Sequence, residues 1–162
     1  MNIKLLIILT ISFFLLSSCK KELIDADEQL LIENYLANKG ITAVQDAEAG
    51  YYLFYYKKIS ETDGTPIIKA VLNKGIEATV NYKASLLDDT VIHETDSASS
   101  EKIVIDEAIA GLQLVLTKMA LGEQVLVVLP SRLAYGSTSL DNVPTNSILV
   151  FEIELLDLHP HF

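Results

Sequence analysis

The chain has 162 residues, 50% of them hydrophobic, and a formal net charge of −10 at pH 7. So acidic a protein repels phosphate groups, which argues against a nucleic-acid partner. The single cysteine, Cys19, excludes a disulfide within the chain, and the length suits one domain with a sizeable hydrophobic core.

The first residues predict an export signal. One positive charge, Lys4, precedes an apolar run from Leu5 to Leu16, which is short for a membrane-spanning helix because such a helix takes about 20 residues. The stretch LSSC that ends at Cys19 resembles a bacterial lipobox, in which the cysteine is acylated and becomes the new amino terminus. We expect residues 1–18 to be a lipoprotein signal peptide and the acyl chains on Cys19 to attach the protein to the inner or outer membrane of a bacterial envelope. An ordinary signal peptide with a chance cysteine is the alternative.

The mature chain is expected to begin with a short tether, residues 19–24, followed by a helix over residues 25–39. Asp25, with Glu28 three residues later, has the spacing of a capping box at a helix start. Gly40 is a suitable helix stop. Between these signals, apolar side chains recur at roughly helical spacing: Leu30, Leu31, Tyr35 and Leu36.

The pattern then changes to one that favours β-structure. After Gly50, the stretch YYLFYY is rich in aromatic residues and predicts a leading strand, which ends at the turn signals of ETDGTP. The run over residues 76–87 largely alternates and meets Asp88 and Asp89 at a predicted hairpin turn, and a return strand begins at Val91. The two aspartates also raise the alternative of a carboxylate pair for acid–base or metal chemistry, but their place between two strands favours turn residues.

Further strands and one helix complete the pattern. A polar loop, HETDSASSE, precedes a short strand with Ile103 and Ile105, and helical periodicity returns over residues 106–119. Two strands follow, residues 124–129 and 147–158, joined by a loop that contains SRLAYGSTS. The sum predicts an α+β fold: an antiparallel sheet of about five or six short strands with one short helix against one face.

Several motifs follow one another in the second half of the chain: VNY in a strand, an apolar-Ala-Gly-Leu helix, Met-x-x-Gly-Glu, LAYG, a Val-Pro turn and LVFEIELL. Their order and spacing resemble the FKBP family of peptidyl-prolyl cis-trans isomerases, and the resemblance covers residues 75–158. We therefore assign residues 75–162 to an FKBP-like domain and residues 25–74 to an N-terminal helix and leading strand. The resemblance implies a sheet curled around the short helix, with a shallow apolar pocket between them.

The resemblance also implies which residues form this pocket. The side chains expected to act in catalysis are Tyr82, Ile109, Tyr135 and Phe151, and those expected to bind substrate are Ile92, His93, Leu112 and Val143. The Tyr135 hydroxyl is expected to hydrogen-bond a carbonyl of a bound peptide, while Gly136 permits the backbone bend that aims it. Each position also has a plain structural interpretation. For Phe151 in a central strand, and for His93 at a strand end, the structural and functional interpretations both stay open.

The implied chemistry is rotation about the peptide bond before proline, which crosses a barrier of about 18–20 kcal/mol because amide resonance must be broken. A twisted amide has less charge separation than a planar one. An apolar pocket therefore favours the twisted form, and a hydrogen bond made only in that form adds to the effect. We expect no cofactor and no metal, since His159 and His161 at the end of the chain lack a third ligand.

Three departures from the family pattern predict weakened catalysis. Ile92 and His93 stand where the family has an aromatic residue and an aspartate, and Leu112 stands where many members have tryptophan. The loop HETDSASSE also lacks the aromatic residue that usually helps to wall the pocket. We expect a monomeric, lipid-anchored isomerase of low activity that helps exported, proline-containing polypeptides to fold. The alternative is a non-catalytic FKBP-like module that holds a partner in an envelope assembly.

Overall fold

A computed structural model describes residues 25–47, 49–57, 75–95 and 99–160. The elements in chain order, with η for a 3₁₀ helix, are α2 (Ala26–Lys39), β1 (Val44–Gln45), β2 (Tyr52–Lys57), β3 (Ile76–Leu86), β4 (Val91–Glu94), β5 (Glu101–Val104), η2 (Ile105–Glu107), α3 (Ala110–Leu116), β6 (Gln124–Leu129), η3 (Ser131–Leu133) and β7 (Leu149–Pro160). Most strands lie close to the predicted ranges. The helix predicted over residues 106–119 is α-helical only in α3, because η2 takes up its start.

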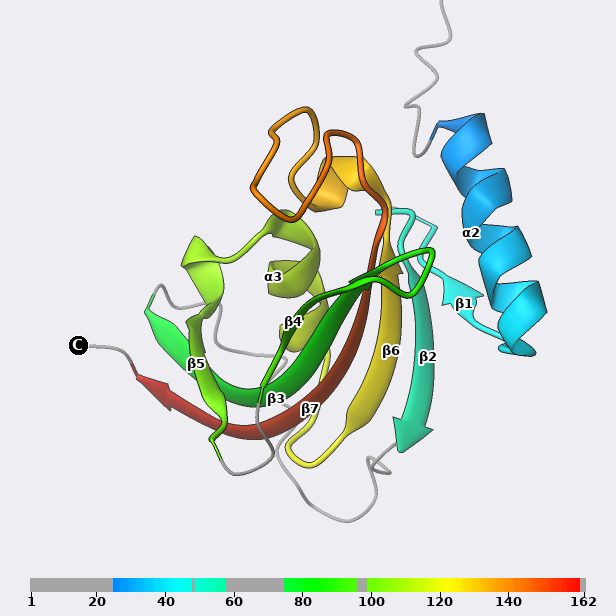
Figure 1. The fold of residues 1–162 in the computed structure, drawn as a ribbon. Helices are drawn as coiled ribbons and strands as arrows, with labels where there is room; N and C mark the ends of the chain where they lie inside the picture. Colours follow the sequence, from blue (N-terminus) through cyan, green and yellow to red (C-terminus); the bar gives the residue numbers. More distant parts are fainter. Residues whose placement is uncertain (1–24, 48, 58–74, 96–98, 161–162) are drawn as a thin grey trace, which may run out of the picture.

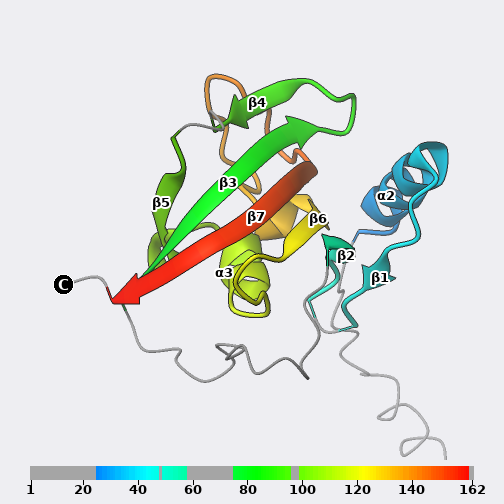
Figure 2. The same ribbon diagram turned by 90° about the horizontal axis from the view of Figure 1, so that it is seen from below.

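The strands form one antiparallel sheet in the order β1-β2-β6-β7-β3-β4, and β5 also pairs with β3. This sheet curves around α3, and α2 lies on the other side beside β1 and β2 (Figure 1; Figure 2). The predicted α+β class and antiparallel sheet are confirmed. The sheet has seven strands, because the two-residue strand β1 adds an edge that local sequence does not signal.

Strand β6 lies between β2 and β7 and is buried on both faces. Val125, Val127 and Leu129 pack with α3, whereas Leu126 and Val128 pack with α2, because successive side chains of a strand point to opposite faces. The continuous apolar run VLVVL is what a strand covered on both faces requires. Strand β6 therefore joins two hydrophobic clusters, one on each side of the sheet.

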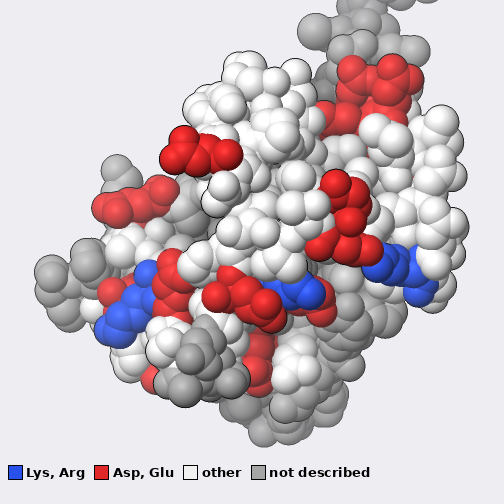
Figure 3. Space-filling model, viewed as in Figure 1, with Lys and Arg blue, Asp and Glu red and all other residues white. Residues whose placement is uncertain are grey.

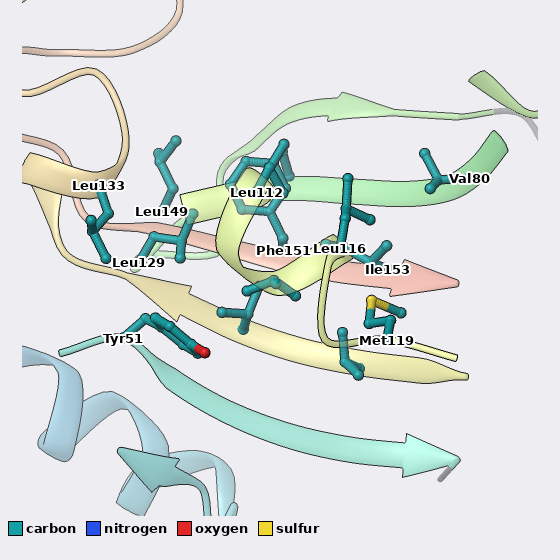
Figure 4. Close-up of a cluster of buried hydrophobic side chains, with 14 of the residues drawn as sticks. Tyr51, Val80, Leu112, Leu116, Met119, Leu129, Leu133, Leu149, Phe151 and Ile153 are labelled. Atoms are coloured by element: carbon teal, nitrogen blue, oxygen red, sulfur yellow. The ribbon is translucent and has the colours of Figure 1, made fainter. Parts of the chain in front are cut away.

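The larger cluster lies between the sheet and α3. Leu112 and Leu116 of the helix lie beside Phe151 and Ile153 of β7 (Figure 4). Gly111 allows this close packing, because a Cβ atom at that position would lie 2.4 Å from Cδ1 of the buried Leu129. Helix α3 is thus held at a fixed distance from β6.

The smaller cluster lies under α2. Ile32 is fully buried and Leu36 is 5% exposed, and both pack with Tyr52, Leu126 and Val128. Among the apolar positions singled out from the sequence, Leu36 is buried and Tyr35 is partly buried, whereas Leu30 and Leu31 are exposed. Ile32, which the sequence pattern did not single out, is the central contact of the helix.

The ends of α2 follow the predicted capping signals in part. The Asp25 carboxylate accepts a hydrogen bond from the Asp27 backbone N–H at 2.9 Å, and Gly40 ends the helix in the left-handed conformation with φ of 66°. The predicted capping box is wrong in its second half. Glu28 does not turn back to the helix start, because its carboxylate binds Ser131 instead.

Strand β2, which contains most of the stretch YYLFYY, pairs with β6 and so belongs to the same sheet as the later strands. The signal peptide over residues 1–18, the tether over residues 19–24 and the lipidation of Cys19 remain predictions, because these residues lie outside the described part of the chain. Within the described ranges, no helix combines the length and the apolar character needed to cross a membrane.

Candidate functional site

A cavity of about 310 Å³ opens between α3 and the sheet. Its lining residues are Tyr82, Ala84, Ile92, His93, Glu101, Ile103, Glu107, Ala108, Ile109, Leu112, Tyr135, Leu149 and Phe151. Seven of the eight pocket residues implied by the sequence resemblance are among them. The fold therefore brings together side chains that lie far apart along the chain.

The register of the sheet explains why a hollow forms here. Ala84 on β3 lies opposite His93 on β4 and opposite Phe151 on β7. Residues that lie directly opposite each other across a sheet point to the same face, so the three side chains form one row. The small Ala84 side chain stands between two larger ones and leaves space above it.

The floor of the cavity is part of the hydrophobic core. Leu112 is 7% exposed and Phe151 is 4% exposed, and both belong to the larger buried cluster. Ile109, directly before α3, is partly buried and packs against the same cluster. Phe151 therefore belongs to the core and also borders the cavity, and its role in catalysis stays a prediction.

Tyr135 lies in the loop after η3 and is 38% exposed. The loop is braced by backbone hydrogen bonds from the Gly136 N–H to the Ser131 carbonyl at 2.9 Å and from the Asn146 N–H to the Gly136 carbonyl at 2.7 Å. Gly136 has φ of 55°, a conformation that glycine adopts without strain. Within the described part of the chain, the Tyr135 hydroxyl has no hydrogen-bond partner, so it is available to a ligand.

One wall of the cavity is formed by three side chains in mutual contact. The rings of Tyr82 and His93 are stacked with their centroids 4.9 Å apart, and His93 Nε2 lies 2.8 Å from Oε2 of Glu101. Burial, and then the negative charge of Glu101, raise the pKa of the Tyr82 hydroxyl to about 12, so that this hydroxyl stays protonated as a hydrogen-bond donor. His93 has replaced the expected aspartate, but Glu101 brings another carboxylate to the same wall.

Glu101 and Ile103 were not predicted to belong to the site. They are alternate residues of β5, so they share a face, and that face borders the cavity. Glu101 is the last residue of the loop stretch HETDSASSE, whose composition indicated only a polar turn. The stretch EKIV does not alternate between polar and apolar residues, so only the pairing of β5 with β3 shows where this face points.

Glu107 was also missed. It ends η2, two residues before Ile109, and its exposed side chain lines the cavity. In the described ranges its carboxylate has no hydrogen-bond or ion-pair partner. Sequence reasoning had no means of placing it, since an acidic residue just before a helix is common for reasons of helix stability alone.

Val143 is the one predicted substrate-binding residue that does not line the cavity. It is 3% exposed, belongs to the larger core cluster, and forms an isolated β-bridge with Leu140. This bridge closes a turn in the long loop before β7. A role for Val143 in substrate binding stays a prediction, and its contacts are those of a residue that supports the loop.

The two other sites considered from the sequence, the pair Asp88 and Asp89 and the histidines at the end of the chain, contain residues that form ordinary structural hydrogen bonds and ion pairs. Asp88 and Asp89 lie in the turn between β3 and β4, where the Asp88 carboxylate accepts the Thr90 N–H at 3.0 Å and Asp89 pairs with Lys39 at 2.7 Å. His159 Nε2 lies 3.0 Å from an Asp157 carboxylate oxygen, and His161 is outside the described part of the chain. Among the described residues, no three side chains of His, Cys, Asp or Glu lie close enough together to hold a metal ion.

The second half of the chain matches a family model. Residues 69–156 match the FKBP-type peptidyl-prolyl cis-trans isomerase family. The chain is 33% identical to FkpA, an FKBP-type peptidyl-prolyl cis-trans isomerase of Buchnera aphidicola subsp. Schizaphis graminum, over 64% of this chain and 47% of that protein. It is 35% identical to human FKBP9, a peptidyl-prolyl cis-trans isomerase, over 57% of this chain and 17% of that protein. The chain thus spans less than half the length of either curated relative.

Solved structures share the fold. The crystal structure of FkpA from Escherichia coli superposes on this chain with a TM-score of 0.66 at 23% sequence identity. The superposition covers 82% of this chain and 59% of the FkpA chain. A peptidyl-prolyl cis-trans isomerase from Pseudomonas syringae pv. tomato superposes with a TM-score of 0.62 at 20% identity and covers 83% and 96% of the two chains. The two superpositions cover a larger part of this chain than residues 69–156, which the family model matches.

Proposed function

Since the chain belongs to the FKBP-type peptidyl-prolyl cis-trans isomerase family, we propose that it catalyses rotation about the peptide bond before proline. The observation that best supports this activity is that Tyr82, Ile109, Leu112, Tyr135 and Phe151 line one and the same cavity. Four of them, Tyr82, Ile109, Tyr135 and Phe151, are side chains of the kinds that the family pattern implies, and Leu112 stands where many members have tryptophan. The five residues come from separate parts of the chain: Tyr82 from β3, Ile109 from just before α3, Leu112 from α3, Tyr135 from the loop after η3, and Phe151 from β7.

The cavity can lower the rotation barrier without a reactive group. Leu112, Ile109 and Phe151 offer an apolar surface to the proline ring, where the twisted amide is favoured because it has less charge separation than the planar amide. The Tyr135 hydroxyl can donate a hydrogen bond to a substrate carbonyl, which helps if the bond is stronger in the twisted geometry. No covalent step is needed.

We expect the rate to be low. Leu112 and Ile92 present smaller surfaces than the aromatic residues that the family pattern has at these positions, so the proline ring makes fewer contacts in the cavity. Each loss of about 1.36 kcal/mol in transition-state stabilisation lowers the rate tenfold. Two or three such losses would bring the rate close to that of the uncatalysed reaction.

The proposed setting is the bacterial cell envelope, with exported polypeptides as substrates and acyl chains on Cys19 as the membrane anchor. The sequence LSSC supports this setting. A non-catalytic module that binds a partner is the second candidate. The His93–Glu101 pair favours it, because two polar side chains at 2.8 Å stand in the wall of a cavity that would otherwise be more apolar.

The decisive test is a protease-coupled isomerisation assay with the peptide Ala-Leu-Pro-Phe. We expect the wild-type protein to accelerate isomerisation, and Tyr135→Phe to reduce kcat/KM about two- to tenfold, because one hydrogen bond to substrate is lost. Tyr35→Phe on α2 removes a hydroxyl outside the cavity and should leave kcat/KM unchanged.

A lack of acceleration would leave the binding module, provided that NMR titration with the same peptide shifts the signals of Tyr82 and Leu112. If the folded protein neither accelerates the reaction nor binds the peptide, the proposed function is wrong.

A further inference from the structure

The cavity wall has a strong charge bias. Glu101 and Glu107 both line the cavity, whereas no lysine or arginine of the described ranges does. Acidic side chains also lie on several sides of the uncharged surface over α3 and β4 (Figure 3). The net charge of −10 means that acidic residues outnumber basic ones over the chain as a whole.

Glu101 is held in place by the sheet and by His93. Its strand, β5, pairs with β3 so that Glu101 lies opposite Val80, and its carboxylate contacts the His93 imidazole at 2.8 Å. Among the described residues, no lysine or arginine forms an ion pair with Glu101. The next residue on β5, Lys102, pairs with Glu77 at 2.7 Å and does not line the cavity.

Glu107 carries a second negative charge at the same cavity, from the opposite end of the β5–η2 segment. Its carboxylate has no hydrogen-bond or ion-pair partner in the described part of the chain, and its side chain is exposed. The apolar side chains of Ile103 and Ile109 line the cavity together with the two carboxylates. The wall therefore combines apolar contact area with negative charge.

This combination matches a long basic side chain, whose aliphatic stem packs on apolar groups while its charged end meets a carboxylate. From it we infer that the cavity selects prolyl peptides that carry lysine or arginine next to the proline and disfavours those that carry glutamate or aspartate there. Like charges repel an acidic peptide, which adds discrimination that apolar contacts cannot provide. The inference rests on the proposed function, because it assigns substrate preference to the same cavity.

The test uses NMR exchange spectroscopy with peptides Ala-Xaa-Pro-Xaa-Ala, where Xaa is lysine, norleucine or glutamate. We expect kcat/KM to fall in that order, and Glu101→Gln and Glu107→Gln each to reduce the lysine-to-norleucine ratio about two- to fivefold, the size of a half-exposed ion pair. The ratio should also fall with added salt. His93→Ala should raise the ratio, because Glu101 then loses a partner that competes with the substrate.

Asp27→Asn is the matched control, because it removes one negative charge from α2, on the other face of the sheet, and should leave the ratio unchanged. If the protein accelerates all three peptides equally, the inference is overturned while the proposed function stands. If it accelerates none of them, the proposed function fails, and dissociation constants for the same peptides decide the inference. The inferred preference for basic peptides would be overturned if the three peptides had equal dissociation constants. It would also be overturned if both Gln variants still preferred the lysine peptide as strongly as the wild-type protein does.

Discussion

Glu28 binds Ser131 twice: its carboxylate accepts the Ser131 backbone N–H at 3.1 Å and the Ser131 hydroxyl at 2.5 Å. The Ser131 carbonyl in turn accepts the N–H groups of Ala134 and Gly136, both at 2.9 Å. The first turn of α2 is thereby connected to the loop that carries Tyr135. A helix that lies outside the cavity therefore helps to position one of its side chains.

We predict that Glu28→Ala lowers the free energy of unfolding by about 1–3 kcal/mol, the cost of removing the charged partner of partly buried donors. It should also reduce kcat/KM, because the Tyr135 loop loses a support. Urea unfolding of Glu28→Ala, Ser131→Ala and the double variant measures the coupling, for which we expect about 0.5–3 kcal/mol. Strictly additive effects would show that the two residues do not stabilise each other.

The contribution of α2 to stability can be tested at two neighbouring positions. Ile32 is fully buried under the helix, whereas Leu31 is 53% exposed. Ile32→Ala should lower the free energy of unfolding by about 2–4 kcal/mol, since it leaves a cavity in the cluster with Leu126 and Val128. Leu31→Ala should change it by less than about 0.5 kcal/mol. Thermal unfolding that finds equal losses in the two variants would contradict the observed packing of the helix.

Gly111 offers a test of the packing between α3 and β6. Gly111→Ala would place a methyl group 2.4 Å from Cδ1 of Leu129, a fully buried residue that cannot move freely. We expect a net loss of about 1–2 kcal/mol in stability, because overpacking outweighs the higher helix propensity of alanine. A higher melting temperature in this variant would show that Leu129 can move aside.

The contact between His93 and Glu101 predicts that substitutions at these two positions affect activity in a non-additive way. Ile92→Phe together with His93→Asp introduces the residue types of the family pattern, but the new aspartate would face Glu101, which now contacts His93 at 2.8 Å. Repulsion between the two carboxylates should limit the gain in activity. Adding Glu101→Gln should then raise kcat/KM about two- to tenfold above that of the double variant. The isomerisation assay would contradict this prediction if the third substitution had no effect or lowered the rate.

The membrane anchor is tested at Cys19, the only cysteine of the chain. Cys19→Ala should abolish incorporation of a labelled fatty acid and move the protein out of the membrane fraction, because one thiol is the expected attachment point. Labelling that is unchanged in the variant would show that the chain is not lipidated at Cys19.

The fold class and most residues that line the candidate cavity could be predicted from the sequence alone. Alternation and helical periodicity depend on local geometry, so they show where β3, β6, β7 and α3 lie. The order and spacing of VNY, LAYG and LVFEIELL resemble the FKBP family, and that resemblance implied Tyr82, Tyr135 and Phe151 as pocket residues, which the structure brings to one cavity. Such motifs can be recognised because each is a contiguous stretch whose residues are placed by their own strand or loop.

The contacts between elements that are distant along the chain could not be predicted from local sequence. The pairing of β5 with β3 brings Glu101 to His93, and the packing of α2 brings Glu28 to Ser131 and buries Ile32 in place of Leu31. A local pattern shows that a strand or helix has two kinds of face, but it does not show which surface each face will contact. That choice depends on how several elements pack at once, and the polar contacts of this cavity follow from it.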